Sequence, residues 1–251
     1  MDLQFHQFTY NSDNYGVLVH DPSSGATACV DAGDGQAVLT ALKDTGWSLT
    51  HLWITHHHWD HTDGLAEVKT ATGCHVIGPD GIAGIDQILR GGDSFDFAGH
   101  RVDLIHTPGH TLDMLNFYIA DAQTVFTGDT LFVMGCGRLF EGDGPMMWHS
   151  MQKLKALPPE TVIYCAHEYT LASLDFALSI DPDNAALLVQ ADRVRARRAK
   201  GEATVPTDLA TELATNPFLR PGDPAIRATL GMQTASDAEV FTEIRARKDS
   251  F

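Results

Sequence analysis

Cysteine is scarce in this chain of 251 residues. The four cysteines, Cys29, Cys74, Cys136 and Cys165, are widely spaced and form no C-x-x-C pair, so a four-cysteine zinc site is not expected. In a reducing compartment they would be free thiols that act mostly as small buried hydrophobic residues. No local pattern marks one of them as a catalytic nucleophile.

The chain also has no long apolar run and few basic residues. No apolar stretch approaches the ~20 residues that a membrane-spanning helix needs, so no membrane association is expected. The first six residues lack the basic and then apolar pattern of a secretory signal peptide, which predicts a cytoplasmic protein. Lys plus Arg number 17 against 33 for Asp plus Glu, a formal charge of −16, which argues against nucleic-acid binding.

Short apolar segments separated by Gly, Asp and Pro turns fill the first two thirds of the chain. Residues 17–20 and 28–31 flank a turn at 21–25 and predict a hairpin. Further strands are expected at 52–55, 102–105, 115–119, 124–127 and 161–166, with helices at 36–43 and 146–157.

The pattern becomes helical after His167. Helices are expected at 171–180 and 185–200, and Ser236-Asp237-Ala238-Glu239 has the capping-box pattern that opens a last helix. We therefore predict two parts, an α/β catalytic domain over 1–168 and a helical substrate-binding domain over 169–251.

A compact group of potential metal ligands follows the apolar segment 52–55. His56, His58, Asp60 and His61 form an H-x-H-x-D-H pattern, and imidazole and carboxylate are ligands that suit zinc and related divalent ions. Residues 56 and 58 would point to one side of an extended segment, whereas His57 between them should face away. One short loop can thus supply ligands to two metal ions.

Three other residues of ligand type stand at the ends of predicted strands. His110, Asp129 and His167 each follow an apolar segment, and strand ends gather at one edge of a sheet. Of the chain's 13 histidines, we expect the following to be structural or surface residues: His6, His20, His51, His57, His75, His100, His106 and His149.

These residues resemble the signature of the metallo-β-lactamase superfamily. The match includes Asp31 at an early strand end, the H-x-H-x-D-H loop, His110, Asp129 and His167, in that order. The resemblance implies an αββα sandwich with a binuclear site. It assigns His56, His58 and His110 to the first metal. It assigns Asp60, His61 and His167 to the second, with Asp129 bridging both; Asp31 would be a strand-end cap.

Other segments are similar to glyoxalase II, the hydroxyacylglutathione hydrolase family. They are residues 135–142, residues 167–170, Asn216-Pro217-Phe218-Leu219-Arg220, and residues 245–249. This resemblance, which covers essentially the whole chain, implies substrate contacts through Arg138, Phe140, Tyr169, Arg245 and Lys248. Some relatives have Lys and Tyr where this chain has Arg138 and Phe140, which changes the expected glutathione contacts.

The family resemblance implies a thioester hydrolase that converts S-D-lactoylglutathione to D-lactate and glutathione, the second step of methylglyoxal detoxification. A hydroxide bridging two divalent ions would attack the thioester carbonyl, with Asp60 and Asp129 as catalytic residues that orient it. Zinc is the expected metal, and iron and manganese also suit these ligands. A monomer is expected.

Three alternatives are open at this point. One is a glutathione persulfide dioxygenase of the same superfamily, which would use a single iron and is expected to lack the 216–220 and 245–249 segments. Another is a different hydrolase of the same fold, such as a lactonase or a β-lactamase. The third is a non-enzymatic metal-binding or nucleic-acid-binding module, which the acidic charge and the open ligand set oppose.

Overall fold

The computed structural model describes residues 2–251, and its internal contacts divide the chain into two compact units. The first unit comprises Met1–His106 and Asp113–Gly128, and the second comprises Thr107–Leu112 and Asp129–Phe251. Among the described residues, no helix combines the length and apolar character that crossing a bilayer requires.

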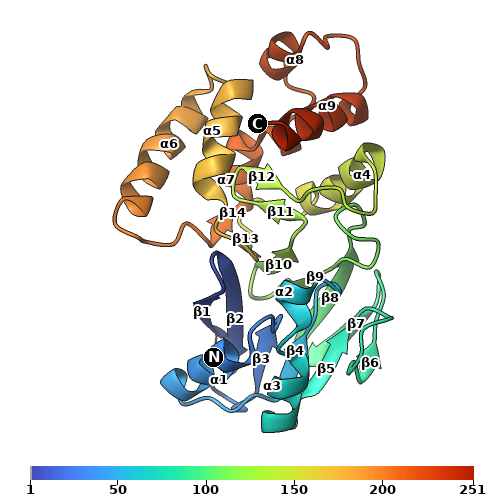
Figure 1. Ribbon diagram of the computed structural model, residues 1–251, viewed down its shortest axis with the longest axis vertical. Helices are drawn as coiled ribbons and strands as arrows, with labels where there is room; N and C mark the ends of the chain where they lie inside the picture. Colours follow the sequence, from blue (N-terminus) through green and yellow to red (C-terminus); the bar gives the residue numbers. More distant parts are fainter. Residues whose placement is uncertain (1) are drawn as a thin grey trace. The chain divides into compact units, whose positions relative to one another are not determined.

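The first sheet belongs to the first unit and has the order β1-β2-β3-β4-β5-β6 (Figure 1). Its strands β1 to β3 pair antiparallel and β3 to β6 pair parallel. The strands are β1 (Gln4–Tyr10), β2 (Asn14–His20), β3 (Thr27–Val30), β4 (His51–Trp53), β5 (His75–Gly78) and β6 (Gln87–Ile88). The β2–β3 pairing confirms the predicted hairpin.

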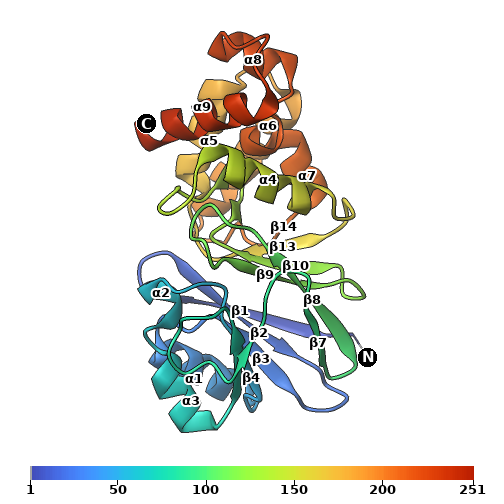
Figure 2. The ribbon, with the colours of Figure 1, turned by 90° about the vertical axis from the view of Figure 1, so that its right-hand side faces the viewer.

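Two helices of the first unit cover one face of this sheet. Helices α1 (Gly35–Thr45) and α3 (Leu65–Thr72) lie on the same side of it in two perpendicular views (Figures 1 and 2). Their apolar stripes, including Val38, Leu42 and Val68, pack against Leu52 and Val76 of the strands in one buried cluster. The period of the apolar residues therefore fixes which helix face meets the sheet.

The opposite face of the first sheet packs against four more strands of the same unit, ordered β10-β9-β8-β7 and paired antiparallel. They are β7 (Ser94–Phe97), β8 (His100–His106), β9 (Leu115–Ile119) and β10 (Thr124–Gly128). The fully buried Trp53 ring fills the space between the sheets, with ring centroids 5.1 Å from Phe97, 5.5 Å from Phe117 and 6.3 Å from Phe126. Burial of these aromatic side chains joins the two sheets into a sandwich.

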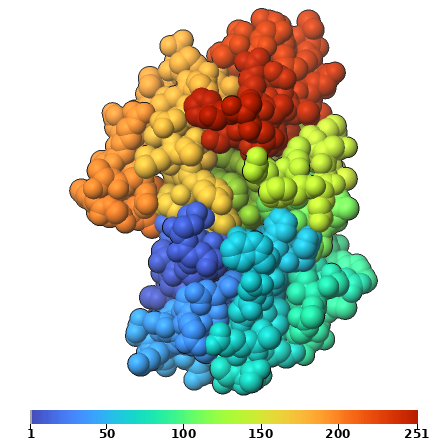
Figure 3. All heavy atoms as spheres, viewed as in Figure 1, coloured from blue at the N-terminus to red at the C-terminus, as the bar shows by residue number. Residues whose placement is uncertain are grey.

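The second unit is mainly helical. Its elements are β11 (Leu131–Phe132), β12 (Gly135–Cys136), α4 (Gly144–Lys155), β13 (Val162–Cys165), α5 (Thr170–Ile180), α6 (Ala185–Arg198), β14 (Thr207–Asp208), α7 (Leu209–Thr215), the 3₁₀ turn η1 (Pro217–Leu219), α8 (Pro224–Leu230) and α9 (Asp237–Asp249). Helices α8 and α9 are at its surface (red in Figure 3). The Ser236–Glu239 capping box that begins α9 is present as predicted.

The fold class is confirmed: mixed α/β sheets come first and a helical region follows. Each of the four helices predicted before Ser236 is present to within two residues at either end. The division into parts 1–168 and 169–251 stays a prediction about which part does the chemistry.

Candidate metal and substrate site

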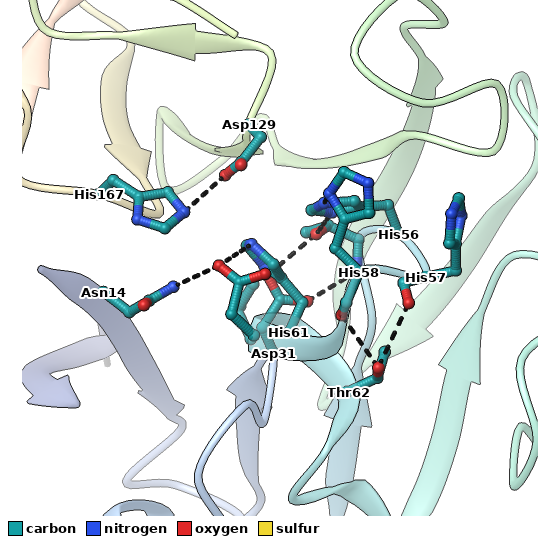
Figure 4. Close-up of polar contacts among 12 residues, drawn as sticks. Asn14, Asp31, His56, His57, His58, His61, Thr62, Asp129 and His167 are labelled. Atoms are coloured by element: carbon teal, nitrogen blue, oxygen red, sulfur yellow. Dashed lines mark hydrogen bonds and ion pairs between the residues drawn. The ribbon is translucent and has the colours of Figure 1, made fainter. Parts of the chain in front are cut away.

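The H-x-H-x-D-H segment is separated from the end of β4 by two residues, and its second half lies in the one-turn helix α2 (Trp59–Thr62). His56 and His61 are fully buried, and His58 and Asp60 are half-buried. Figure 4 shows the three histidines of this pattern together with Asp31 and Thr62. Thr62 Oγ1 donates to the carbonyl of His58 at 2.9 Å, which fixes the turn between the ligand-type residues.

Asp31 organises two of the histidines. Its carboxylate accepts the Thr55 backbone N–H at 2.8 Å, the Thr55 hydroxyl at 2.9 Å and His61 Nδ1–H at 2.7 Å. Because the single hydroxyl hydrogen of Thr55 points to Asp31, Thr55 Oγ1 must accept from His56 Nδ1, 2.9 Å away. One buried carboxylate thus leaves the Nε2 lone pairs of both His56 and His61 available for a metal ion.

The backbone of Asp31 also fits this role. Its φ angle is +59°, a left-handed conformation that Asp adopts more readily than bulky residues do. The expectation that Asp31 is a structural residue rather than a ligand agrees with these contacts.

Ring nitrogens approach one another within this first cluster. His56 Nε2 lies 3.1 Å from His58 Nδ1, and His61 Nε2 lies 3.5 Å from Asp60 Oδ2. Two nitrogen lone pairs at 3.1 Å repel unless a proton or a cation lies between them. The donor set therefore fits a divalent metal ion.

Asp60 is held from two sides by residues that the sequence did not mark as functional. Asn14 Nδ2 donates to Asp60 Oδ2 at 3.0 Å, and the Tyr10 hydroxyl donates to the Asp60 carbonyl at 3.1 Å. A Cβ on Gly33 would lie 1.9 Å from the same carbonyl, so only glycine allows this approach. Single polar residues 46 and 50 positions away carry no spacing pattern that could have revealed them.

A second cluster of ligand type forms around Asp129 in the other unit. His110 Nε2 lies 3.3 Å from Asp129 Oδ2, and His167 Nε2 lies 3.3 Å from Asp129 Oδ1 (the latter pair is drawn in Figure 4). All three side chains are buried. One carboxylate that faces a different imidazole with each oxygen has the arrangement of a bridging ligand.

The loop after β12 orients His110. His110 Nδ1 donates to the carbonyl of Arg138 at 2.9 Å, which leaves Nε2 directed at Asp129. A Cβ on Gly137 would lie 2.0 Å from the Asp129 carbonyl, so the glycine lets the two chain segments lie side by side. Both units therefore carry His/Asp clusters of metal-ligand type, and hydrogen bonds at Nδ1 fix the tautomers of His56, His61 and His110.

Three of the five predicted substrate contacts lie beside the second cluster. Tyr169 stacks on the His167 ring at 4.7 Å with an interplanar angle of 4°, and 41% of it is exposed. Phe140 meets the His110 ring edge-on at 5.3 Å and is 61% exposed. The Arg138 guanidinium lies 5.8 Å from the Phe140 ring centroid and 3.6 Å from Asp249.

The other two predicted contacts, Arg245 and Lys248, already have partners within the chain. Arg245 is only 4% exposed; Nη1 donates to the Cys136 carbonyl at 2.8 Å and Nη2 to Asp249 at 2.9 Å. Lys248 Nζ donates to the Ala172 carbonyl at 2.7 Å, and burial lowers the pKa of its ammonium group. Arg245 supports the 135–138 segment, whereas Lys248 keeps part of its surface accessible.

Several other expectations concern histidines and cysteines. His57 pairs with Asp113 at 3.0 Å, and His20 stacks on Trp47 at 4.3 Å. The four cysteines are free and buried, as expected. Burial raises the pKa of Cys136 to about 11 and of Cys165 to about 12, so neither is a thiolate nucleophile near neutral pH.

Comparison with known proteins agrees with both parts of the chain. The family model described as metallo-beta-lactamase superfamily matches residues 14–87 and 80–167, and the model described as hydroxyacylglutathione hydrolase C-terminus matches residues 168–251. Among solved structures, ETHE1 from Myxococcus xanthus superposes with a TM-score of 0.68 over 98% of this chain and 99% of that chain; at 23% identity this likeness shows the fold alone.

Curated relatives match over the full length. The proteins named hydroxyacylglutathione hydrolase from Maricaulis maris and Brucella ovis are each 51% identical to this chain. The first alignment covers 100% of this chain and 99% of the relative, and the second covers 99% and 98%. The chain therefore belongs to the hydroxyacylglutathione hydrolase family of the metallo-β-lactamase superfamily.

Proposed function

We propose that this protein hydrolyses S-D-lactoylglutathione to D-lactate and glutathione, the second step of methylglyoxal detoxification. The observation that carries the proposal is the end-to-end match, at 51% identity, to relatives named for this activity. In the reaction an oxygen from water bonds to the thioester carbonyl carbon, the carbon–sulfur bond breaks, and sulfur leaves as the glutathione thiolate. The matching model over residues 168–251 favours this hydrolase over a persulfide dioxygenase.

Two divalent metal ions are part of the proposal. His56, His58 and His110 would hold one ion, and Asp60, His61 and His167 the other, with Asp129 shared. When bound, such ions supply Lewis acidity and lower the pKa of a bound water to near neutrality. Zinc is our proposed metal, because the ligand set is nitrogen and carboxylate oxygen; iron and manganese are the other ions that suit it.

The protein's own residues keep this donor set in place. Asp31 fixes the orientation of His56, through Thr55, and of His61. Asn14 and Tyr10 hold Asp60, and the Arg138 carbonyl holds His110. Asp60 and Asp129 are the proposed catalytic residues, because each has a carboxylate oxygen within 3.5 Å of an imidazole Nε2. The thiolate is a good leaving group, so no separate general acid is assigned.

Glutathione is the proposed recognition element of the substrate. Its two carboxylates need cationic partners, and Arg138 and Lys248 supply them in a chain of formal charge −16. Tyr169 and Phe140 offer exposed aromatic surface next to the histidines. Arg245 would support the substrate-binding segment from the protein interior, because its guanidinium already binds the Cys136 carbonyl.

We further propose a monomer that acts in the cytoplasm and binds no nucleic acid. Four free buried thiols suit a reducing compartment, and the acidic charge opposes nucleic acid. We also propose that residues 1–168 carry the chemistry and that residues 169–251 bind the substrate; the two family models meet at this boundary.

The central test is hydrolysis of S-D-lactoylglutathione, followed by loss of thioester absorbance. Metal-replete and chelator-stripped protein are compared, with a thioester that lacks glutathione as the control substrate. Metal-dependent turnover of the glutathione thioester alone is the expected result. Absence of turnover by protein that holds two metal ions would remove this function, and oxygen uptake with glutathione persulfide would then support the dioxygenase.

Two substitutions test the residue assignments. Asp129→Ala should reduce both metal content and turnover, whereas His149→Ala, on an exposed histidine, should change neither. Lys248→Ala should raise KM for the glutathione thioester and leave the control thioester unaffected. Arg247→Ala is the matched control, because this arginine lies on the same helix and pairs with Glu243 instead.

A further inference from the structure

The hairpin β11–β12 joins two segments that the proposed function needs. Asp129 lies two residues before β11, and the Arg138 carbonyl that accepts from His110 lies two residues after β12. Each strand has only two residues, and Met134 in the turn has a left-handed φ of +54°. A two-stranded hairpin of this size is not stable by itself, so its position must be set by contacts from outside it.

Glu212 of helix α7 supplies one such contact. Its side chain is fully buried, and Oε2 accepts the backbone N–H of Met134 at 2.8 Å, in the turn of the hairpin. Oε1 accepts from the Thr207 hydroxyl at 3.0 Å, close to the start of the same helix. A buried acidic side chain is costly unless it is fully hydrogen-bonded, and here the donors come from the hairpin and from the chain around α7.

Asn216, four residues further along the chain, supplies further contacts to the hairpin. Asn216 Nδ2 lies within hydrogen-bond distance of Phe132 O, Gly135 O and Glu212 Oε2, at 3.2, 3.0 and 3.0 Å. Its Oδ1 accepts from the Phe218 N–H at 3.0 Å, which orients the amide group. Asn216 therefore spans both strands of the hairpin and links them to Glu212.

We propose that Glu212 and Asn216 are positioning residues that hold the β11–β12 hairpin, and through it Asp129 and the Arg138 carbonyl, in the geometry that metal binding and hydrolysis require. Neither residue is one of the proposed metal ligands or substrate contacts, so both act through the hairpin. They hold the turn of the hairpin, and a shift of this turn would move Asp129 before β11 and the Arg138 carbonyl after β12. The expected effect of these residues on turnover rests on the proposed function. Their expected effect on metal binding rests only on the His and Asp donor set.

Substitutions of Glu212 can test whether its hydrogen bonds or its negative charge matter for the hairpin. A glutamine amide can present its oxygen to Met134 N–H and Asn216 Nδ2, and its nitrogen to Thr207 Oγ1, since a hydroxyl can also accept. Glu212→Gln therefore preserves every contact. Glu212→Ala instead removes the acceptor of three donors, the buried Met134 N–H and Asn216 Nδ2 and the half-buried Thr207 hydroxyl. Burial raises the pKa of Glu212 to about 7, so a neutral side chain is readily accommodated there.

The experiment compares Glu212→Ala, Asn216→Ala and Glu212→Gln with wild type and with Ile226→Ala. Ile226 is fully buried in α8, so its truncation destabilises the same unit without touching the hairpin. Metal affinity is measured by competition with a chelator, and the absorption spectrum of the cobalt(II)-substituted protein is recorded. The free energy of unfolding, kcat and KM are measured for each variant as well.

Glu212→Ala and Asn216→Ala should weaken metal binding and lower kcat by about 10-fold or more, the effect usual for residues that orient metal ligands, and alter the cobalt spectrum. Glu212→Gln and Ile226→Ala should bind metal as wild type does. If the folded alanine variants match Ile226→Ala in metal affinity and spectrum, the proposal is overturned. If either alanine variant does not fold, Glu212→Asp, which withdraws the carboxylate by one methylene, must show the same losses in a folded protein.

Failure of the proposed function gives a different result. Wild type would then bind two metal ions without hydrolysing the thioester, while metal affinity and the cobalt spectrum would still respond to Glu212→Ala and not to Ile226→Ala.

Discussion

At the scale of single residues, Asp31 is the group on which most of the first cluster depends. It accepts from Thr55 and His61 and, through Thr55, fixes His56. Asp31→Asn keeps a residue that tolerates the left-handed backbone but replaces one acceptor oxygen by a donor that faces other donors. We expect metal affinity to fall by roughly 10- to 100-fold, measured by chelator competition.

Asp44→Asn, on the exposed end of α1, serves as its control and should leave metal affinity unchanged. Equal affinities for wild type and Asp31→Asn would mean that His56 and His61 do not need this carboxylate to present Nε2.

Glu212 makes the stability of the protein depend on pH. Burial raises its pKa from 4.5 to about 7, so between these values the folded protein binds more protons than the unfolded chain. The stabilisation from protonated Glu212 is therefore full below about pH 4.5 and is lost as pH rises to about 7. Glu212→Gln cannot ionise, so its unfolding free energy relative to wild type should rise from pH 5 to pH 7 and then level off. Denaturant unfolding at several pH values measures this, and a difference that stays constant with pH would contradict it.

At the scale of elements, helix α9 depends on its first turn. Ser236 Oγ accepts from the Glu239 N–H at 3.3 Å, and the Glu239 carboxylate accepts from the Ser236 N–H at 2.7 Å. Ser236→Ala removes one half of this capping box and should lower the free energy of unfolding by about 1 kcal/mol, measured with urea. Ser12→Ala, in an exposed turn, should have no such effect. A Ser236→Ala protein as stable as wild type would show that tertiary contacts alone fix the start of α9.

The elements also show why the sequence predicts some features and not others. The ligand-type residues 56–61 were found because they are contiguous and follow an apolar strand. Five helices were found from their apolar period or capping pattern, whereas α3, α7 and α8, with only seven or eight residues each, were missed. Strand β1 was missed, since Gln4–Tyr10 is mostly half-buried and has no strong alternation. Asn14, Glu212 and Asn216 were missed as positioning groups because their partners lie 46 to 84 residues away. The sequence does not distinguish a basic residue near the end of a helix that is exposed from one that, like Arg245, is buried.

At the scale of the whole molecule, the protein and its proposed substrate both carry negative charge. A chain of formal charge −16 repels an anionic thioester at long range, so recognition must come from a few local cations such as Arg138 and Lys248. Asp249 lies 3.6 Å from Arg138 and 2.9 Å from Arg245, which holds both guanidinium groups beside the 135–138 segment. The acidic surface and the basic substrate contacts are therefore compatible because they act over different distances.

Metal binding should stabilise the whole fold, because the proposed ligands are far apart in the sequence and come together only in the folded chain. A ligand present at 100 times its Kd adds about 2.7 kcal/mol to the free energy of unfolding, which for a chain of this size raises Tm by roughly 5–10 °C. Thermal unfolding of chelator-stripped protein, titrated with zinc, should show this rise. Asp129→Ala should reduce it, because the proposed shared ligand is lost, whereas His149→Ala should show the full rise. An equal rise in all three proteins would place the stabilising ion at residues other than those assigned here.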